Sequence, residues 1–499
     1  MDIRKRVAAE RELNPWAMLS SLCVGFFLIL VDATIVAVAQ PNIQQSLGAD
    51  LNGVVWVSSA YLLAYVCPLL ISGRLGDSYG PKQIYQLGLL IFTVASLLCA
   101  LALSIEMLIV ARIVQGVGAA LLTPQTMTLI NRVFPQEKRG AAMGLWGATL
   151  GLGTLAGPLL GGLITGLLGW RWIFYLNLPL GAVALLMAWR FVPDLPRRRH
   201  RFDSVSVVLS TVGVASFVFA VHTGNQRHWP VWIWLLMGFG VVMIAYLAIR
   251  QRSLADPLIP LSLFRDRNFT VCTIAALCLG FATVAMLTPQ MFYLQLVGGM
   301  TPIQAALVST PMAVLAVGLS PVVGRVVDKV HPRYVLGTGF FLFATAILLF
   351  AAIAKPGTPV WQLLVVSVLA GMASSCIFGP LSATATRHLP SVAAGAASSM
   401  YNTVRQLGGV LGSAAIAASI QMGVSAELAA RIGTAERRGA EPLTPPLRSE
   451  LAEVMSHALL LPAGAFIVAT VLAIALHGRE QAAAAHATER ADAVDVVAG

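Results

Sequence analysis

Residues 16–40 read WAMLSSLCVGFFLILVDATIVAVAQ and contain a single charged side chain, Asp32. An α-helix needs about 20 consecutive apolar residues to cross the hydrocarbon core of a bilayer. This stretch is long enough, and it does not alternate apolar and polar residues as a strand of a membrane β-barrel does. It therefore predicts a membrane-spanning helix that carries one acid.

The composition of the whole chain agrees with that prediction. Of 499 residues, 57% are hydrophobic and 11% are charged, whereas a soluble domain carries about 25% charged residues. This excludes a water-soluble globule, a nucleic-acid-binding protein and a disordered scaffold, and predicts an all-α polytopic membrane protein. Fourteen apolar windows are expected to span the membrane, at 16–40, 54–73, 84–104, 107–130, 141–165, 172–192, 204–223, 231–250, 268–290, 303–323, 334–354, 359–382, 393–422 and 456–477.

The basic residues predict how the chain is oriented. An even number of spans puts both termini on the same side of the membrane. If that side is the cytoplasm, 24 of the 33 Lys and Arg residues fall in cytoplasmic segments and 7 on the opposite side. This asymmetry is the positive-inside pattern. The formal net charge of +11 is therefore interpreted as a topology signal, and the chain is expected to be a multi-pass protein of the cytoplasmic (inner) membrane.

Two loops at equivalent positions indicate an internal duplication. GRLGDSYGPK (73–82) follows the second window and GRVVDKVHPR (324–333) follows the tenth. Both begin with Gly-Arg, carry Asp at the fifth position and end on a basic residue, as the two halves of an internally duplicated chain would. The simplest division is six spans, two inserted spans and six spans. Its segments are a cytoplasmic N-terminus (1–15), a six-helix bundle (16–192), a basic linker with two inserted helices (193–267), a second bundle (268–478) and a flexible cytoplasmic tail (479–499).

The sequence predicts no cofactor and no metal. It contains no GxxxxGK[ST] phosphate loop, so no ATP-driven motor is expected within the chain. The six Cys residues lie in apolar windows without a CxxC motif, and the eight His residues lack the spacing of metal ligands. The two inserted helices are expected to be a structural pair that faces lipid.

Ionisable residues inside a membrane are costly and rarely idle. Asp32 is the one acid placed well inside a window; it either pairs permanently with one partner or binds and releases a proton. Arg112, near the outer end of the fourth window, either snorkels to the surface or lines a cavity beside Asp32. Arg405 lies near the middle of the thirteenth window, where it either bonds to Gln406 and backbone carbonyls or meets an anionic part of a substrate.

A row of glycines marks the fifth window. Gly153, Gly157 and Gly161 recur every four residues, with Pro158 and Gly162 beside them. Small residues at this spacing let two helix backbones approach closely, and a proline permits a bend. The row predicts a packing face, which could also act as a hinge.

Five motifs in order resemble those of the major facilitator superfamily, specifically its fourteen-helix drug:proton antiporter family. They are LVDATIVAVAQP (30–41), GRLGDSYGPK (73–82), RIVQGVGAA (112–120), GTLAGPLLGG (153–162) and WRWIFYLNLPLG (170–181). The first departs from the family pattern at Ala37 and Gln40. The second has Ser78 and Pro81 where the family usually has Arg, which puts the strength of its cytoplasmic contact in question.

The resemblance implies the major facilitator fold and proton-coupled export of amphipathic or hydrophobic compounds, as in multidrug efflux and antibiotic resistance. It implies that Asp32 and Arg112 couple transport to protons, and that GTLAGPLLGG is the antiporter motif. The other expected site residues are a cytoplasmic latch (Gly73, Gly76, Asp77, Gly80 and Lys82) and a substrate cavity (Thr34, Gln115, Gln290, Tyr293 and Arg405). The implied partners are a small amphipathic substrate, protons and membrane lipids, with no ATP and no nucleic acid.

Other functions remain open at this point. The same machinery could export a native lipid, a siderophore or a metabolite, and proton-driven uptake uses the same fold. A membrane enzyme would need clustered His, Asp, Glu or Cys residues at one membrane face, and the sequence shows no such cluster. A receptor that no longer transports would be expected to lack the intramembrane acid that this chain keeps.

Overall fold

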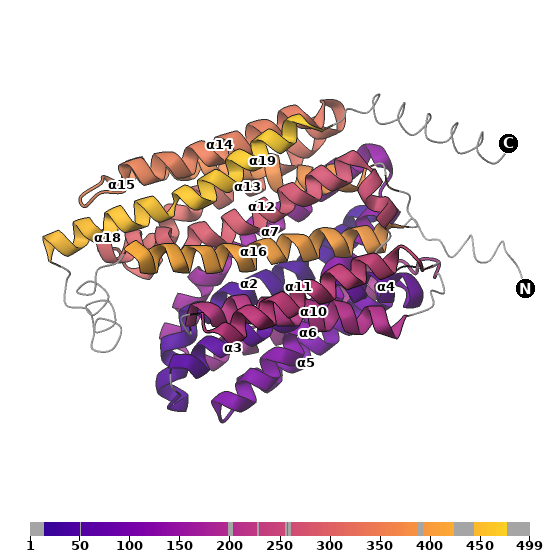
Figure 1. The fold of residues 1–499 in the computed structure, drawn as a ribbon, viewed down its shortest axis with the longest axis horizontal. Helices are drawn as coiled ribbons and strands as arrows, with labels where there is room; N and C mark the ends of the chain where they lie inside the picture. Colours follow the sequence, from indigo (N-terminus) through magenta and orange to yellow (C-terminus); the bar gives the residue numbers. More distant parts are fainter. Residues whose placement is uncertain are drawn as a thin grey trace, which may run out of the picture. The chain divides into compact units, whose positions relative to one another are not determined.

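A computed structural model describes residues 14–49, 51–197, 203–226, 229–254, 257, 261–387, 389, 393–423 and 444–476 (Figure 1). All regular structure in these residues is helical. The chain begins with α2 (Pro15–Leu47), α3 (Leu51–Val66), α4 (Leu69–Tyr79), α5 (Pro81–Ala100), α6 (Ile105–Val133), α7 (Gln136–Leu167), α8 (Arg171–Tyr175) and α9 (Asn177–Phe191). It continues with α10 (Ser204–Gln226), α11 (Val231–Gln251), the 3-10 turn η1 (Leu261–Arg265), α12 (Arg267–Phe292) and the π-helical turn η2 (Tyr293–Val297). The last helices are α13 (Pro302–Lys329), α14 (Pro332–Ile353), α15 (Val360–Thr386), α16 (Ala394–Gly423), α18 (Pro445–Ala458) and α19 (Leu460–Ile474).

The described helices include many that can cross a membrane. Ten are long and apolar enough, or up to eleven if α3 and α4 together form one bent span. These two helices meet at 48° within the predicted window 54–73. The bend follows from Pro68 between them, because proline donates no hydrogen bond and interrupts a helix. Helices also occupy the remaining predicted windows, among them α7 and α16.

Local sequence signals fix the ends of individual helices. The side chain of Asn14 accepts a hydrogen bond from the backbone N–H of Trp16 at 3.0 Å, and Pro15 opens α2. The helix ends at Gly48, which has φ of 60°, a conformation that glycine adopts readily. Thr301 and Gln304 form a reciprocal capping box at the start of α13.

The chain forms two compact units. The first comprises the described residues of Met1–Pro135, Thr149–Pro260 and Ser391–Thr403, and the second those of Gln136–Ala148, Leu261–Pro390 and Val404–Gly499. The division runs inside α7 and α16. The glycines of early α7 account for its assignment: a Cβ on Gly144 would lie 2.6 Å from the carbonyl oxygen of Ser320, and one on Gly147 would lie 3.0 Å from the Cα of Gly379.

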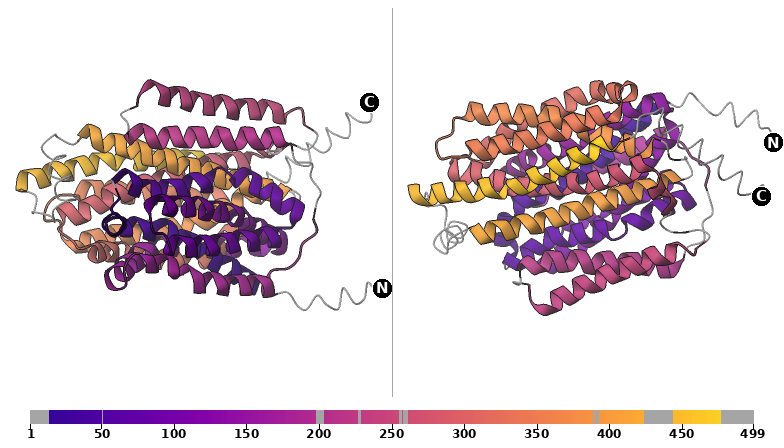
Figure 2. Two further views of the ribbon diagram at one scale, coloured as in Figure 1. Left: turned by 90° about the horizontal axis from the view of Figure 1, so that it is seen from below. Right: turned by 45° about the horizontal axis from the view of Figure 1, so that its top comes forward.

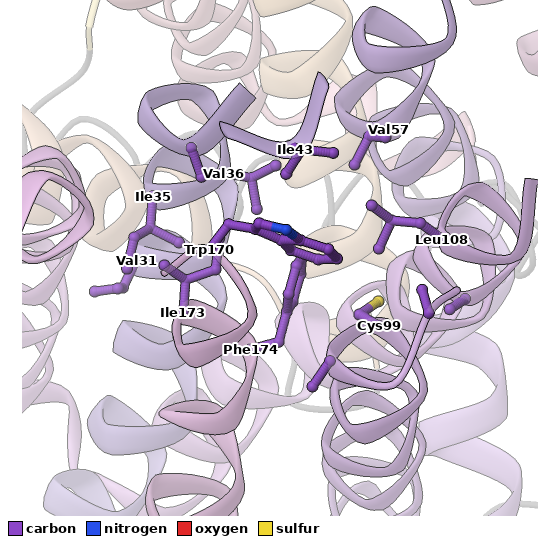
Figure 3. Close-up of a cluster of buried hydrophobic side chains, with 14 residues drawn as sticks. Val31, Ile35, Val36, Ile43, Val57, Cys99, Leu108, Trp170, Ile173 and Phe174 are labelled. Carbon is purple, nitrogen blue, oxygen red and sulfur yellow. The ribbon is translucent and has the colours of Figure 1, made fainter. Parts of the chain in front are cut away.

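A buried apolar cluster in the first unit joins the helices that carry Asp32 and Arg112. Trp170 lies at the centre of the labelled side chains in Figure 3 and makes an edge-to-face contact with Phe174, their ring centroids 6.2 Å apart. Its other labelled members are Val31, Ile35, Val36, Ile43, Val57, Cys99, Leu108 and Ile173. Because lipid tails are as apolar as these side chains, close packing holds such a cluster together more than water exclusion does.

The two inserted helices, α10 and α11, form a hairpin at the edge of their unit (Figure 2). They pack closely, since a Cβ on Gly240 would lie 2.8 Å from the carbonyl oxygen of Gly213. Asp203 joins their ends through Arg250, with Nε donating to Oδ2 at 2.9 Å and Nη2 to Oδ1 at 3.1 Å. Hydrogen bonds from Arg250 and Ser206 hold the pKa of Asp203 below its usual range. This stabilisation is therefore present at neutral pH and is lost only below the ordinary range of an aspartate.

Candidate functional site

Asp32 lies fully buried on α2 and accepts three hydrogen bonds. Arg112 on α6 donates from Nη1 to Oδ2 at 2.5 Å. Gln115, also on α6, donates from Nε2 to Oδ1 at 2.9 Å, and Asn177 at the start of α9 donates from Nδ2 to the same oxygen at 2.9 Å. The carboxylate thus connects three helices that lie far apart in the sequence.

Arg112 is buried and has partners on all sides. Besides Asp32, its Nη1 donates to Oε1 of Gln115 at 2.6 Å, and its Nε donates to the carbonyl oxygen of Val57 at 3.2 Å. The guanidinium carbon lies 4.0 Å from the ring centroid of Tyr61, a cation–π distance. Arg112 was expected either to snorkel to the membrane surface or to lie beside Asp32. In the structure it lies beside Asp32.

A second layer of polar groups holds the two amides in place. Gln115 and Asn177 both donate to the hydroxyl oxygen of Ser96, at 2.7 and 3.2 Å. Ser96 is completely buried, and Asn177 is 1% exposed. Ser96, Tyr61 and Asn177 were not predicted as site residues from the sequence. Asn177 could have been found as the lone amide in the WRWIFYLNLPLG stretch.

The arrangement links proton binding to side-chain movement. Both oxygens of Asp32 accept hydrogen bonds, and a proton on either oxygen would turn that acceptor into a donor. The hydrogen bond that this oxygen accepts from Arg112, Gln115 or Asn177 would be weakened. The cluster can therefore convert a change of protonation at α2 into a rearrangement at α6 or α9.

The glycine face of α7 packs on α2 directly beside Asp32. A Cβ on Gly153 would lie 2.6 Å from the Cβ of Leu30, and one on Gly161 would lie 3.0 Å from Cγ1 of Ile35. Between them, a Cβ on Gly157 would lie 2.8 Å from the Cβ of Thr34 and would also meet its Oγ1. Gly162 in the same motif has nothing within 4 Å of its added Cβ, and Pro158 also lies within α7.

The expected latch residues gather at the ends of α4 and α16. Asp77 is buried and forms an ion pair with Arg132 of α6. A Cβ on Gly395 would lie 2.6 Å from the carboxyl carbon of Asp77, and the backbone N–H of Gly73 donates to Oγ of Ser399 at 2.9 Å. Gly395 and Ser399 were not foreseen, because nothing in the sequence of α16 links it to α4.

The remaining latch residues have different surroundings. A Cβ on Gly76 would lie 2.7 Å from the amide carbon of Gln125. Gly80 has φ of 102°, which requires glycine between α4 and α5. Lys82 forms a 3.3 Å ion pair with Asp194, whose side chain is 74% exposed, so this pair contributes little to stability.

We expect Asp77→Asn to slow turnover about tenfold, equivalent to about 1.4 kcal/mol of barrier, because Arg132 would lose its ionised partner beside the start of α16. Substrate affinity should stay within a few-fold, since no residue of the Asp32 cluster is changed. Transport rates and binding of purified variants test this, with Asp194→Asn as the control. Unchanged turnover in Asp77→Asn would show that residues 73–82 do not act as a latch and only anchor the topology of the chain.

The five expected cavity residues lie in two places. In the first unit, Thr34 donates to the carbonyl oxygen of Leu30 at 3.0 Å, and Gln115 belongs to the Asp32 cluster. In the second unit, the Tyr293 hydroxyl donates to the carbonyl oxygen of Lys355 at 2.9 Å. Gln290 lines a mostly apolar cavity of about 400 Å³, a volume that includes its open mouth. Arg405 is half-buried on α16.

Comparison with known proteins shows the family of the chain. The family described as Major Facilitator Superfamily matches residues 22–413. The chain belongs to the major facilitator superfamily. Over 488 residues it is 41% identical to an uncharacterized MFS-type transporter of Mycobacterium tuberculosis, covering 95% of this chain and 83% of that protein. Over 402 residues it is 32% identical to the multidrug export protein EmrB of Escherichia coli, covering 79% of this chain and 78% of that protein.

A solved structure shares the fold. The MFS proton:xylose symporter XylE superposes with a TM-score of 0.62 at 12% sequence identity, over 92% of this chain and 94% of that one. This likeness concerns the fold alone. As a member of the major facilitator superfamily, the chain is a multi-pass membrane transporter. The members of this family are carriers rather than enzymes. Relatives of the chain include multidrug export proteins. In the described residues, no three His, Cys, Asp or Glu side chains are grouped to hold a metal ion.

Proposed function

We propose that the chain is a proton-coupled antiporter that exports amphipathic or hydrophobic compounds. The observation that carries this proposal is the buried cluster in which Asp32 accepts from Arg112, Gln115 and Asn177. A buried ion pair is weak as a device for stability, because desolvation offsets much of its attraction. It is well suited to a switch, because protonation of the acid removes the attraction and leaves the arginine to find other partners.

Transport then follows from two protonation states of one carboxyl group. With Asp32 ionised, its hydrogen bonds tie α2 to α6 and α9. With Asp32 protonated, the tie to Arg112 weakens, and the cavity can change the side to which it opens. A membrane potential supplies about 2.3 kcal/mol per charge per 100 mV. Inward proton movement can therefore drive a substrate outward without ATP or a bound cofactor.

The substrate class rests on similarity. EmrB, by its name, is a multidrug export protein, and the match covers 79% of this chain and 78% of that protein. We infer an amphipathic or hydrophobic cargo, exported across the cytoplasmic membrane of the cell. Lipids would contact α11 in particular, since only 17% of its apolar window is buried within the described protein.

We further propose fourteen spans with both termini in the cytoplasm. Cysteine labelling of intact cells in a cysteine-free background tests this orientation. Leu103, 84% exposed between α5 and α6, should be labelled from outside as Leu103→Cys. Tyr79, 53% exposed at the end of α4, should be labelled as Tyr79→Cys only after the membrane is permeabilised. The reverse pattern would overturn the orientation.

Proteoliposomes that contain the purified protein test the function as a whole. A panel of neutral and charged amphipathic compounds is loaded, and a pH gradient is imposed or omitted. At least one compound should accumulate against its gradient only when the pH gradient is present. Transport that is equally concentrative without any ion gradient would contradict proton coupling.

A further inference from the structure

Arg405 lies in the middle of a membrane-spanning helix. It is the twelfth residue of α16, which places it about 16 Å from the start of that helix. A charged side chain at the centre of a span is costly to insert into a membrane. Such residues therefore face the protein interior or a water-filled space and have a partner there.

The helix face that carries Arg405 packs on α12. A Cβ on Gly280 would lie 2.9 Å from the carbonyl carbon of Arg405. One and two turns further along, a Cβ on Gly408 or on Gly412 would lie 2.9 Å from the carbonyl carbon of Leu277 or of Phe281. Positions 405, 408 and 412 share one stripe of α16. The backbone of Arg405 thus lies in a helix–helix contact within the second unit.

In the described part of the chain, Arg405 has no partner. Its Nε is buried and makes no hydrogen bond. The ion pairs of the described residues involve Lys82, Arg112, Arg132 and Arg250. Neither the bond to Gln406 nor one to a backbone carbonyl, which the sequence had suggested, is formed by this guanidinium. A buried donor without a hydrogen bond destabilises the folded protein.

Arg112 is a buried arginine of the same protein whose guanidinium is fully paired in this structure. It has a carboxylate, an amide oxygen, a backbone carbonyl and an aromatic ring within contact. Arg405 makes none of these contacts, and its side chain is half-buried where that of Arg112 is 1% exposed. The contrast leaves the guanidinium of Arg405 open to an anionic group from outside the described residues.

We propose that Arg405 recognises an anionic group, such as a carboxylate, on an amphipathic substrate. This inference rests on the proposed transport function and names a substrate class for it. The guanidinium offers a planar fork of N–H donors that matches a carboxylate with two parallel hydrogen bonds. The apolar cavity beside Gln290 lies in the same unit as Arg405. The proton that is exchanged for the substrate would still bind at Asp32.

Matched fluorescent ligands test the proposal. Pyrenebutyrate and pyrenebutanol share one apolar body and differ in the carboxylate. Saturable binding to purified protein in nanodiscs is followed by energy transfer from tryptophan. The wild type should prefer pyrenebutyrate by about tenfold, equivalent to about 1.4 kcal/mol. Arg405→Gln should bring the ratio close to one, and Arg405→Lys should lower it several-fold because lysine lacks the fork. Arg333→Gln, at the start of α14, should leave the ratio unchanged.

The outcomes separate this proposal from the proposed function. No saturable pyrenebutyrate binding by the wild type, or an unchanged ratio in Arg405→Gln, would overturn the role of Arg405. If Arg405→Gln does not fold, an unchanged ratio in Arg405→Lys would overturn it equally. Asp32→Asn should keep the pyrenebutyrate preference while losing gradient-driven export, so failure at Arg405 leaves proton coupling at Asp32 standing.

Discussion

Asp32→Asn is expected to abolish uphill export driven by a pH gradient, to the level of liposomes without protein. Asparagine has nearly the same shape but does not titrate, so protonation can no longer switch the hydrogen bonds to Arg112, Gln115 and Asn177. Exchange of internal for external substrate should persist, because neither binding nor the change in opening requires net proton movement. Counterflow and gradient-driven transport of one neutral compound measure the two activities.

The variant needs a control for folding. Removing one partner of a buried ion pair costs about 3–5 kcal/mol, since the other charge is left unpaired. Arg112→Gln combined with Asp32→Asn leaves no such charge and should be more thermostable than Asp32→Asn alone. Both variants should lack uphill transport. Full concentrative transport by either one would place the proton site elsewhere.

Gly157→Ala is expected to reduce transport by more than about tenfold, because a Cβ there would lie 2.8 Å from the Cβ of Thr34 and 3.1 Å from the backbone nitrogen of Ile35. The helices α7 and α2 would be forced apart two residues from Asp32. Gly162→Ala is the matched control in the same motif, with nothing within 4 Å of its added Cβ. Initial rates in proteoliposomes compare the two variants at equal protein.

A second substitution tests whether the steric contact is the cause. Thr34→Gly removes the side chain that the new Cβ meets, and should restore part of the activity of Gly157→Ala. The double variant should therefore be more active than expected if the losses of the two single variants were additive. Equal losses in Gly157→Ala and Gly162→Ala would show that general loss of helix flexibility, and not contact with α2, is responsible.

Much of the fold could be predicted from hydropathy, because a membrane span needs a long apolar run and a charge inside it stands out. Asp32 was identified in this way. The division of the second window into two helices, α3 and α4, was not predicted, although the sequence contains Pro68 between them. Apolar windows measure length and composition, whereas a 48° bend depends on how two short helices pack.

The partners of Asp32 were harder to predict. Arg112 and Gln115 were expected on one helix, but Asn177 is 145 residues away from Asp32 in the chain and reaches it only through the packing of α9. Gly395 and Ser399 were missed for the same reason, since long-range contacts leave no periodic signal in one sequence. Tyr293 was expected in a substrate cavity, and its hydroxyl is hydrogen-bonded to Lys355.

The central claim is that protons pass through Asp32 in exchange for substrate, and proton movement driven by substrate alone tests it most directly. Proteoliposomes containing a pH-sensitive dye, clamped at zero membrane potential and without an initial pH gradient, receive a gradient of a neutral substrate. The wild type should move protons opposite to the substrate and change the internal pH, while Asp32→Asn should leave it constant. Equal proton movement by Asp32→Asn, or downhill substrate transport by the wild type without any proton movement, would contradict the account.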